Sequence, residues 1–199
     1  MNLPNKLTIF RIILVPIMVI IPFLGIEGRI FGIPTQWLII DLIFIIASIT
    51  DKLDGYLARK NNQVTTFGKF LDPLADKILV LSAMMMLVEM SKLPAWIPII
   101  VLAREFVISG YRLIAVEKGG KVIAASKWGK IKTVTQMLAI ILAFLDLNAF
   151  GECFSGVLQG GDLVLNLIVT LLMIIQVIAT IFSGVDYMKG SKKYIKDQD

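Results

Sequence analysis

The stretch LVLNLIVTLLMIIQVIATIFSGV, residues 163–185, decides the fold class, because it runs for 23 residues without a charged side chain. A helix needs roughly 20 mostly apolar residues to cross the hydrocarbon core of a bilayer. Five further apolar blocks precede this stretch along the chain. We therefore expect six membrane-spanning helices, at 7–24, 36–58, 70–90, 94–117, 128–147 and 162–188. Glycine-containing loops are expected at 25–35 and 149–161.

The composition favours an all-α integral membrane protein that forms one domain over residues 1–199. Hydrophobic residues make up 57% of the chain and charged residues 18%, whereas an ordinary soluble domain has about 45–50% apolar residues. This balance excludes a disordered chain, a nucleic-acid-binding arm and most soluble enzymes. The chain has no histidine and one cysteine, Cys153, which excludes histidine chemistry, an internal disulfide and a zinc-ribbon site. Acid–base or metal chemistry therefore has to use carboxylates.

The basic residues predict the orientation in the membrane. Seventeen of the twenty lysines and arginines lie on one side of the expected bundle; Arg29 and Lys92 lie on the other, and Arg104 lies inside a helix. Cytoplasmic loops of membrane proteins carry an excess of lysine and arginine. We therefore expect a multi-pass protein of the cell membrane with both termini in the cytoplasm, and the lysines of the C-terminal tail to set orientation and contact anionic lipid.

Four carboxylates lie toward the cytoplasmic ends of two neighbouring helices. Asp51 and Asp54 are three residues apart, and Asp72 and Asp76 are four apart, so each pair shares one helix face. Charged side chains at membrane depth usually face a polar cavity and mark function. Four negative charges together require neutralisation, and hard oxygen ligands suit Mg²⁺ or Mn²⁺. The alternative is that these aspartates cap helices or pair with nearby lysines.

Small residues share the face of the first aspartate pair. Gly55 and Ala58 lie four and seven positions after Asp51, and Arg59 follows at the helix end. A face with almost no side chains admits a bulky flat group, although close helix packing in membranes uses the same residues. Gly68 precedes Asp72 by four residues and allows a tight entry into the next helix.

These residues form the pattern Asp51-x-x-Asp54-Gly55-x-x-Ala58-Arg59, eight residues, then Gly68-x-x-x-Asp72-x-x-x-Asp76. The chain resembles the CDP-alcohol phosphotransferase family, whose signature it matches at all eight specified positions within 26 residues. Stretches at 2–8, 67–77, 103–112 and 126–133 resemble the branch of this family that uses sn-glycerol 3-phosphate as acceptor.

The resemblance implies a six-helix enzyme, usually a homodimer, with a polar active-site cavity open to the cytoplasm. It implies transfer of the phosphatidyl group from CDP-diacylglycerol to sn-glycerol 3-phosphate, with release of CMP and formation of phosphatidylglycerophosphate. Asp76 would be the general base. Two divalent ions, Mg²⁺ or Mn²⁺, would be held by Asp51, Asp54, Asp72 and Asp76. The CDP donor would be bound by Asp54, Gly55, Ala58, Arg59 and Gly68.

A phosphorylated acceptor needs a cationic pocket separate from the metal ions. We expect this pocket to draw on three helices and to consist of Arg104, Arg112, Lys127, Lys132 and Arg11. The alternative is a salt bridge such as Arg104 with Glu105, together with inner-face lysines that only follow the orientation rule.

Two other functions stay open at this point. The same chemistry with phosphatidylglycerol, serine or inositol phosphate as acceptor needs a different pocket but the same aspartates. A small ion or proton-coupled transporter would also place acids on membrane helices, although such a protein has no need for the glycine, alanine and arginine spacing.

Overall fold

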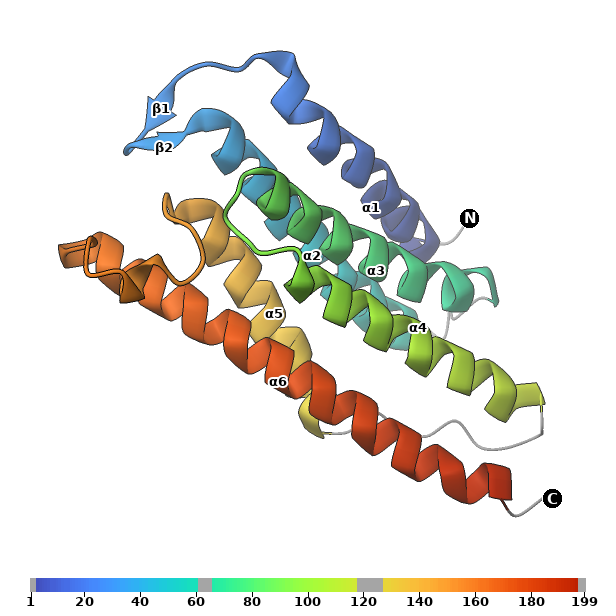
Figure 1. Cartoon of the computed structure of the whole chain (residues 1–199). Coiled ribbons are helices and arrows are strands. Elements are labelled where there is room, and N and C mark those ends of the chain that lie inside the picture. Colours follow the sequence, from blue (N-terminus) through green and yellow to red (C-terminus); the bar gives the residue numbers. More distant parts are fainter. Residues whose placement is uncertain (1–2, 61–65, 118–126, 197–199) are drawn as a thin grey trace.

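The structure, a computed structural model, describes residues 3–60, 66–117 and 127–196, with side chains described for 5–51, 71–112 and 128–189. This part of the chain has six long helices that run side by side as one bundle (Figure 1). Each coincides with one expected segment, and the last continues beyond residue 188. The helices are α1 (Leu3–Ile20), α2 (Thr35–Lys60), α3 (Thr66–Glu89), α4 (Trp96–Glu117), α5 (Lys127–Leu145) and α6 (Gly160–Lys196).

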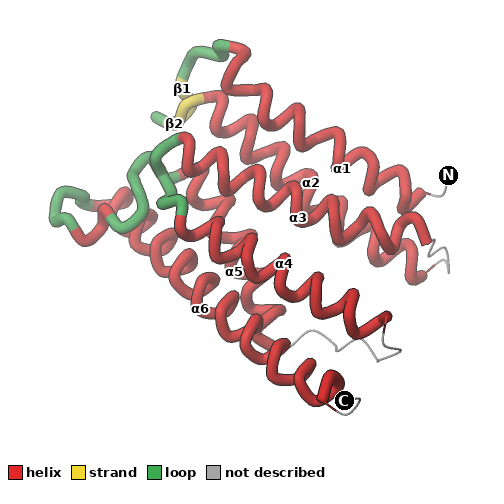
Figure 2. Tube along the Cα trace, turned by 45° about the vertical axis from the view of Figure 1, so that its right-hand side comes forward, coloured by secondary structure: helices red, strands yellow, loops and turns green. Residues whose placement is uncertain are grey.

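The two ends of the bundle differ in what they contain. The connections from α1 to α2, α3 to α4 and α5 to α6 all lie at one end, which we call the loop end (Figure 2). Helix α1 begins, and α6 ends, at the opposite end, which we call the terminal end. This arrangement is the one expected for an even number of antiparallel passes.

An apolar core joins the six helices. Helix α1 packs on α2 and α3, and α6 packs on α5 and α4. The core includes Met18 of α1, Phe44 of α2, Leu87 of α3, Phe144 of α5 and Met173 of α6, all fully buried. Large apolar side chains also cover the outside of every helix. Extensive exposed apolar surface is unusual in a soluble protein and suits a bundle surrounded by lipid.

Helix α1 is continued by a short 3₁₀ helix, η1 (Ile21–Leu24). Three helical stretches of the described part are long and apolar enough to cross a membrane: Asn5–Leu24, Trp128–Leu145 and Gly160–Lys189. Helices α2, α3 and α4 are of similar length but contain the charged residues noted above. Their charged residues therefore distinguish these helices from the other three.

The loop at 25–35 contains a small β-hairpin that the sequence did not predict. Strands β1 (Arg29–Ile30) and β2 (Ile33–Pro34) pair antiparallel, with Ile30 opposite Ile33. Phe31 and Gly32 form the turn with φ of +53° and +82°, as a tight two-residue hairpin requires. The fold is therefore all-helical except for this short hairpin.

Lys92 ties helices together at the loop end. It lies between α3 and α4 and is only 5% exposed. Its Nζ donates to the carbonyls of Ala143 (3.0 Å), Phe144 (3.2 Å) and Asp146. The first two belong to the last turn of α5, where carbonyls lack helical partners, and Asp146 directly follows the helix. The same ammonium lies 3.7 Å from the ring centroid of Trp37. Burial lowers the pKa of Lys92 to about 8, although Asp146 and Asp41 favour its charged form.

Asn166 extends this polar network to α6. Its Nδ2 donates to Asp146 Oδ2 (2.8 Å) and to the Ala149 carbonyl (2.9 Å). Its Oδ1 accepts a hydrogen bond of 2.8 Å from the backbone N–H of Cys153, which lies within a short 3₁₀ helix, η2 (Glu152–Phe154). The loop at 149–161 is therefore fixed against α6 by a fully buried side chain.

Candidate active site

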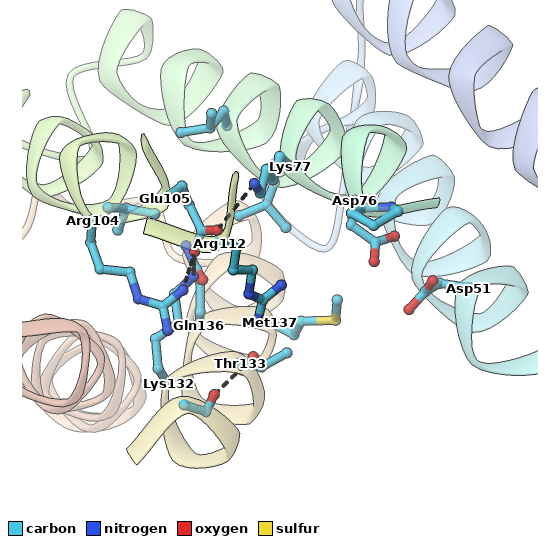
Figure 3. A pocket seen from close by; sticks show the side chains of 15 residues that line it. Asp51, Asp76, Lys77, Arg104, Glu105, Arg112, Lys132, Thr133, Gln136 and Met137 are labelled. Carbon is cyan, nitrogen blue, oxygen red and sulfur yellow. Dashed lines mark hydrogen bonds and ion pairs between the residues drawn. The ribbon is translucent and has the colours of Figure 1, made fainter. Parts of the chain in front are cut away.

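A polar cavity of about 270 Å³ lies between α2, α3, α4 and α5. It has a carboxylate end and a cationic end, which Figure 3 shows on opposite sides of Arg112 and Met137. The polar and charged lining residues are Asp51, Asp76, Lys77, Arg104, Glu105, Arg112, Lys132, Thr133 and Gln136.

Two carboxylates of the signature meet at one cation. The Nη1 atom of Arg11 lies 3.0 Å from Asp51 Oδ1 and 2.6 Å from Asp76 Oδ1. Arg11 belongs to α1 and is fully buried, whereas Asp51 and Asp76 are partly exposed to the cavity. Asp51 and Asp76 therefore converge from α2 and α3 on one position, and they face each other in Figure 3.

Asp72 is held next to this pair. Its Oδ1 accepts a hydrogen bond of 2.5 Å from the hydroxyl of Thr8, one turn before Arg11 on α1. Pro73 follows directly inside α3 and removes one backbone hydrogen bond from the helix. Helix α1 therefore supplies the contacts that fix two of the signature carboxylates of α3.

The donor set of the carboxylate end suits a divalent cation. Its atoms are hard carboxylate oxygens, which Mg²⁺ and Mn²⁺ prefer, and they already surround a positive charge on Arg11. Among the residues with described side chains, no group of three carboxylates is close enough to enclose an ion. The side chain of Asp54, the remaining expected ligand, lies outside that description.

The cationic end is organised around Glu105. Its Oε1 accepts hydrogen bonds from Arg104 Nη1 and Lys132 Nζ, both at 2.7 Å. Its Oε2 lies 3.8 Å from Lys77 Nζ, and Lys77 in turn donates to Ser109 at 2.6 Å. Cations from α3, α4 and α5 are therefore gathered on one carboxylate beside the cavity (Figure 3).

Helix α6 also contributes to this end. Arg104 Nη2 donates to the hydroxyl of Ser183 at 2.6 Å. The guanidinium carbon of Arg112 lies 5.8 Å from the ring centroid of Tyr187, within the range of a cation–π contact. The arginines of α4 are thus supported by the terminal half of α6.

The structure brings five of the expected site residues together around one cavity: Asp51, Asp76, Arg104, Arg112 and Lys132. Asp72 lies against Thr8, close to them in α3. Arg11 is placed differently from the expected acceptor pocket, because its guanidinium is buried against the carboxylates. The expected residues whose side chains lie outside the description are Asp54, Gly55, Ala58, Arg59, Gly68 and Lys127.

Gly68 does not precede α3, as the sequence suggested, but lies in its first turn, because the helix begins at Thr66. The salt bridge of Arg104 with Glu105, which the sequence offered as the alternative to an acceptor pocket, forms. Thr8, Lys77 and Ser183 take part in the site although no motif marked their roles. Their partners come from other helices, which a single sequence does not reveal.

The fold and site define a helical membrane-protein class with a cavity that is acidic at one end and basic at the other. Residues 1–182 match the family model of the CDP-alcohol phosphatidyltransferases. The chain belongs to this family.

Curated proteins named CDP-diacylglycerol–glycerol-3-phosphate 3-phosphatidyltransferase are similar to it. One from Bacillus subtilis (strain 168) is 49% identical over 70% of this chain and 74% of the relative. One from Haemophilus influenzae is 40% identical over 98% of this chain and 96% of the relative. One from Rickettsia felis is 36% identical over 97% of both chains.

Proposed function

We propose that the protein transfers the phosphatidyl group of CDP-diacylglycerol to sn-glycerol 3-phosphate, with formation of phosphatidylglycerophosphate and release of CMP. The observation that carries this proposal is the cavity that joins Asp51 and Asp76 to Arg104, Arg112 and Lys132. One end has the donor set for a diphosphate held with divalent ions, and the other has cations for a second phosphate. The names of the curated relatives support the same pair of substrates.

The carboxylate end is the donor site in this proposal. Two divalent ions, Mg²⁺ or Mn²⁺, would be held by Asp51, Asp54, Asp72 and Asp76. When bound, they would offset the charge of the diphosphate and of the leaving CMP. Gly55, Ala58 and Gly68 would admit the cytidine, with Arg59 on the diphosphate.

Asp76 is the proposed general base. It would accept the proton of the acceptor hydroxyl as that oxygen attacks the β-phosphorus of the donor, and the bond to CMP would break. Asp76 lines the carboxylate end of the cavity, and its side chain is 40% exposed, so it would be accessible to a substrate bound there. An ordinary aspartate is a weak base, so its contribution would come from alignment with both substrates.

The acceptor phosphate would bind at the cationic end. Arg104 and Lys132 lie together on Glu105, Arg112 lines the same cavity, and Lys127 begins α5. Arg11 would act differently from these four, since it neutralises Asp51 and Asp76 before any ion binds.

The proposed topology has six membrane spans, both termini in the cytoplasm and the cavity open to the cytoplasmic side, in a homodimer of the bacterial inner membrane. The six passes are supported by α1 beginning and α6 ending at the terminal end, and the orientation by the excess of lysine and arginine that the sequence predicts on that side.

The test uses purified protein in detergent with CDP-diacylglycerol and Mg²⁺ or Mn²⁺, and follows CMP release. Glycerol 3-phosphate, serine, inositol 1-phosphate and phosphatidylglycerol are added in parallel. We expect CMP only with glycerol 3-phosphate, and none after addition of a chelator until the metal is restored. CMP with another acceptor would overturn the assignment of the cationic end. No CMP with any acceptor, from well-folded protein, would favour a transporter or an inactive homologue.

A further inference from the structure

Glu105 is the carboxylate on which the cations of the cavity meet. A single oxygen, Oε1, accepts from both Arg104 and Lys132 at 2.7 Å, and the side chain is only 15% exposed. A carboxylate that already accepts two charge-assisted hydrogen bonds is poorly suited to accept a proton or bind an ion. Its geometry suits a different task, which is to hold the two cations at fixed positions.

Ser183 provides a second anchor for Arg104. Its hydroxyl accepts from Nη2 at 2.6 Å, while Glu105 accepts from Nη1 at 2.7 Å. Ser183 is buried in α6, and the side-chain stem of Arg104 packs beside Gly184. The guanidinium is therefore held from two sides, by a neighbour on α4 and by α6.

We propose that Glu105 and Ser183 are positioning residues that hold Arg104 and Lys132 as a preformed anion-binding pair, and that this pair selects a phosphorylated acceptor. The inference rests on the proposed function, because it takes glycerol 3-phosphate as the acceptor. It assigns roles to two residues that do not themselves contact the substrate.

The charge balance supports this role. Lys77, Arg104, Arg112 and Lys132 with Glu105 carry a net charge of about +3, and a phosphate monoester carries about −1.5 to −2 charges at pH 7. One phosphate would therefore offset most of the positive charge in this partly buried site. A neutral acceptor such as serine would leave these cations uncompensated.

Pre-ordering explains why a carboxylate belongs in an anion site. Without Glu105, Arg104 and Lys132 would repel each other and their long side chains would move apart. The acceptor would then have to order both side chains on binding, which weakens its affinity. The carboxylate thus removes some positive charge but keeps the remaining charge in place.

The test compares Glu105→Gln and Ser183→Ala with the wild type by two measurements. CMP release gives the KM of each substrate, and isothermal titration with glycerol 3-phosphate alone gives the acceptor Kd. Glu105→Gln should raise acceptor KM and Kd about tenfold or more, because hydrogen bonds to a charged group are lost. Ser183→Ala should raise both roughly threefold. The donor KM should stay within about twofold in both variants.

Ser48→Ala is the matched control, because Ser48 is also buried and helical but, among the residues with described side chains, its hydroxyl bonds to its own helix, at Phe44. It should leave the acceptor KM unchanged. Glu105→Gln with an unchanged acceptor KM and Kd would overturn the proposal. An equal rise in donor KM would also overturn it, since that result indicates a merely structural salt bridge.

If Glu105→Gln does not fold, the acceptor KM and Kd of Ser183→Ala test the proposal instead. This variant is expected to fold because it removes only one hydroxyl. Failure of the proposed function gives a different result: the wild type then releases no CMP with glycerol 3-phosphate, while the titration still compares acceptor binding by the variants. A wild type that binds no glycerol 3-phosphate would overturn the inference together with the function.

Discussion

At the scale of single residues, Asp76 combines an ion pair with access to the cavity. Its Oδ1 lies 2.6 Å from Arg11, yet the side chain is 40% exposed. We expect Asp76→Asn to lower kcat by about 100-fold or more, the range found when a general base is lost. Binding of CDP-diacylglycerol should change far less, because the other donor-site residues remain.

The measurement for Asp76→Asn is CMP release together with donor binding. Asp162→Asn is a suitable control, since Asp162 is an exposed carboxylate at the start of α6, at the loop end. Near-normal turnover of Asp76→Asn would refute the assignment of the base.

Arg112 tests the separation of the two substrate sites. Its guanidinium lines the cavity and is held beside Tyr187. We expect Arg112→Ala to raise the KM for glycerol 3-phosphate about tenfold, as the loss of a charged hydrogen bond predicts, with the donor KM nearly unchanged. Steady-state kinetics in both substrates check this, with the exposed Arg29 replaced by alanine as control. Equal effects on both substrates would contradict separate sites.

Some residue roles followed from spacing and others did not. Asp51 and Asp76 line one cavity, as the signature predicted from the faces of two helices. The pairing of Arg11 with Asp76 spans 65 positions along the chain. It depends on how α1 docks on α2 and α3, which helical periodicity does not specify. The sequence therefore identified Arg11 as a candidate site residue but not Asp51 and Asp76 as its partners.

At the scale of helices and loops, the long apolar blocks predicted all six helices. In lipid, the backbone N–H and C=O groups of such a segment need hydrogen-bond partners, and a helix provides them within the segment itself. The β-hairpin was missed, because Phe31 at its turn has a positive φ, which large side chains rarely adopt. The sequence placed Lys92 near a loop on the less basic side of the bundle and gave no sign that it is buried. Its burial follows from the exposed carbonyls at the end of α5, which attract a cation.

Lys92 gives a stability prediction with a defined pH range. Burial lowers its pKa from 10.5 to about 8, so between these values the folded protein releases a proton that the unfolded chain retains. Stability therefore rises with pH across this range. We expect Lys92→Met to unfold at a lower temperature than the wild type, since it leaves three carbonyls without a donor. This difference in unfolding temperature should widen from about pH 8 to about pH 10, because only the wild type gains stability from Lys92 over that range.

Thermal unfolding in detergent at several pH values checks this prediction. Lys189→Met is the control, because Lys189 is exposed near the end of α6 and should show no such dependence. A difference that stays constant or shrinks as the pH rises would contradict the role of Lys92.

At the scale of the whole molecule, the single cysteine permits a direct test of orientation. Cys153 lies in the 149–161 loop at the loop end, which should face away from the cytoplasm. In a Cys153→Ser background, we expect Ser155→Cys, at an exposed site of the same loop, to react with a membrane-impermeant maleimide added to spheroplasts. Gln198→Cys near the C-terminus should react only after permeabilisation. The reverse pattern would invert the topology.

The guanidinium of Arg11 has a consequence for how the protein is assembled and loaded. Because α1 brings a tethered counter-charge to Asp51 and Asp76, the helices can dock without waiting for a divalent ion. If these carboxylates hold a divalent ion as proposed, the incoming ion would compete with a covalently attached cation at high effective concentration. The ion level at half-occupancy would then depend on α1 as well as on the carboxylates, and insertion into the membrane and activation would be separate events.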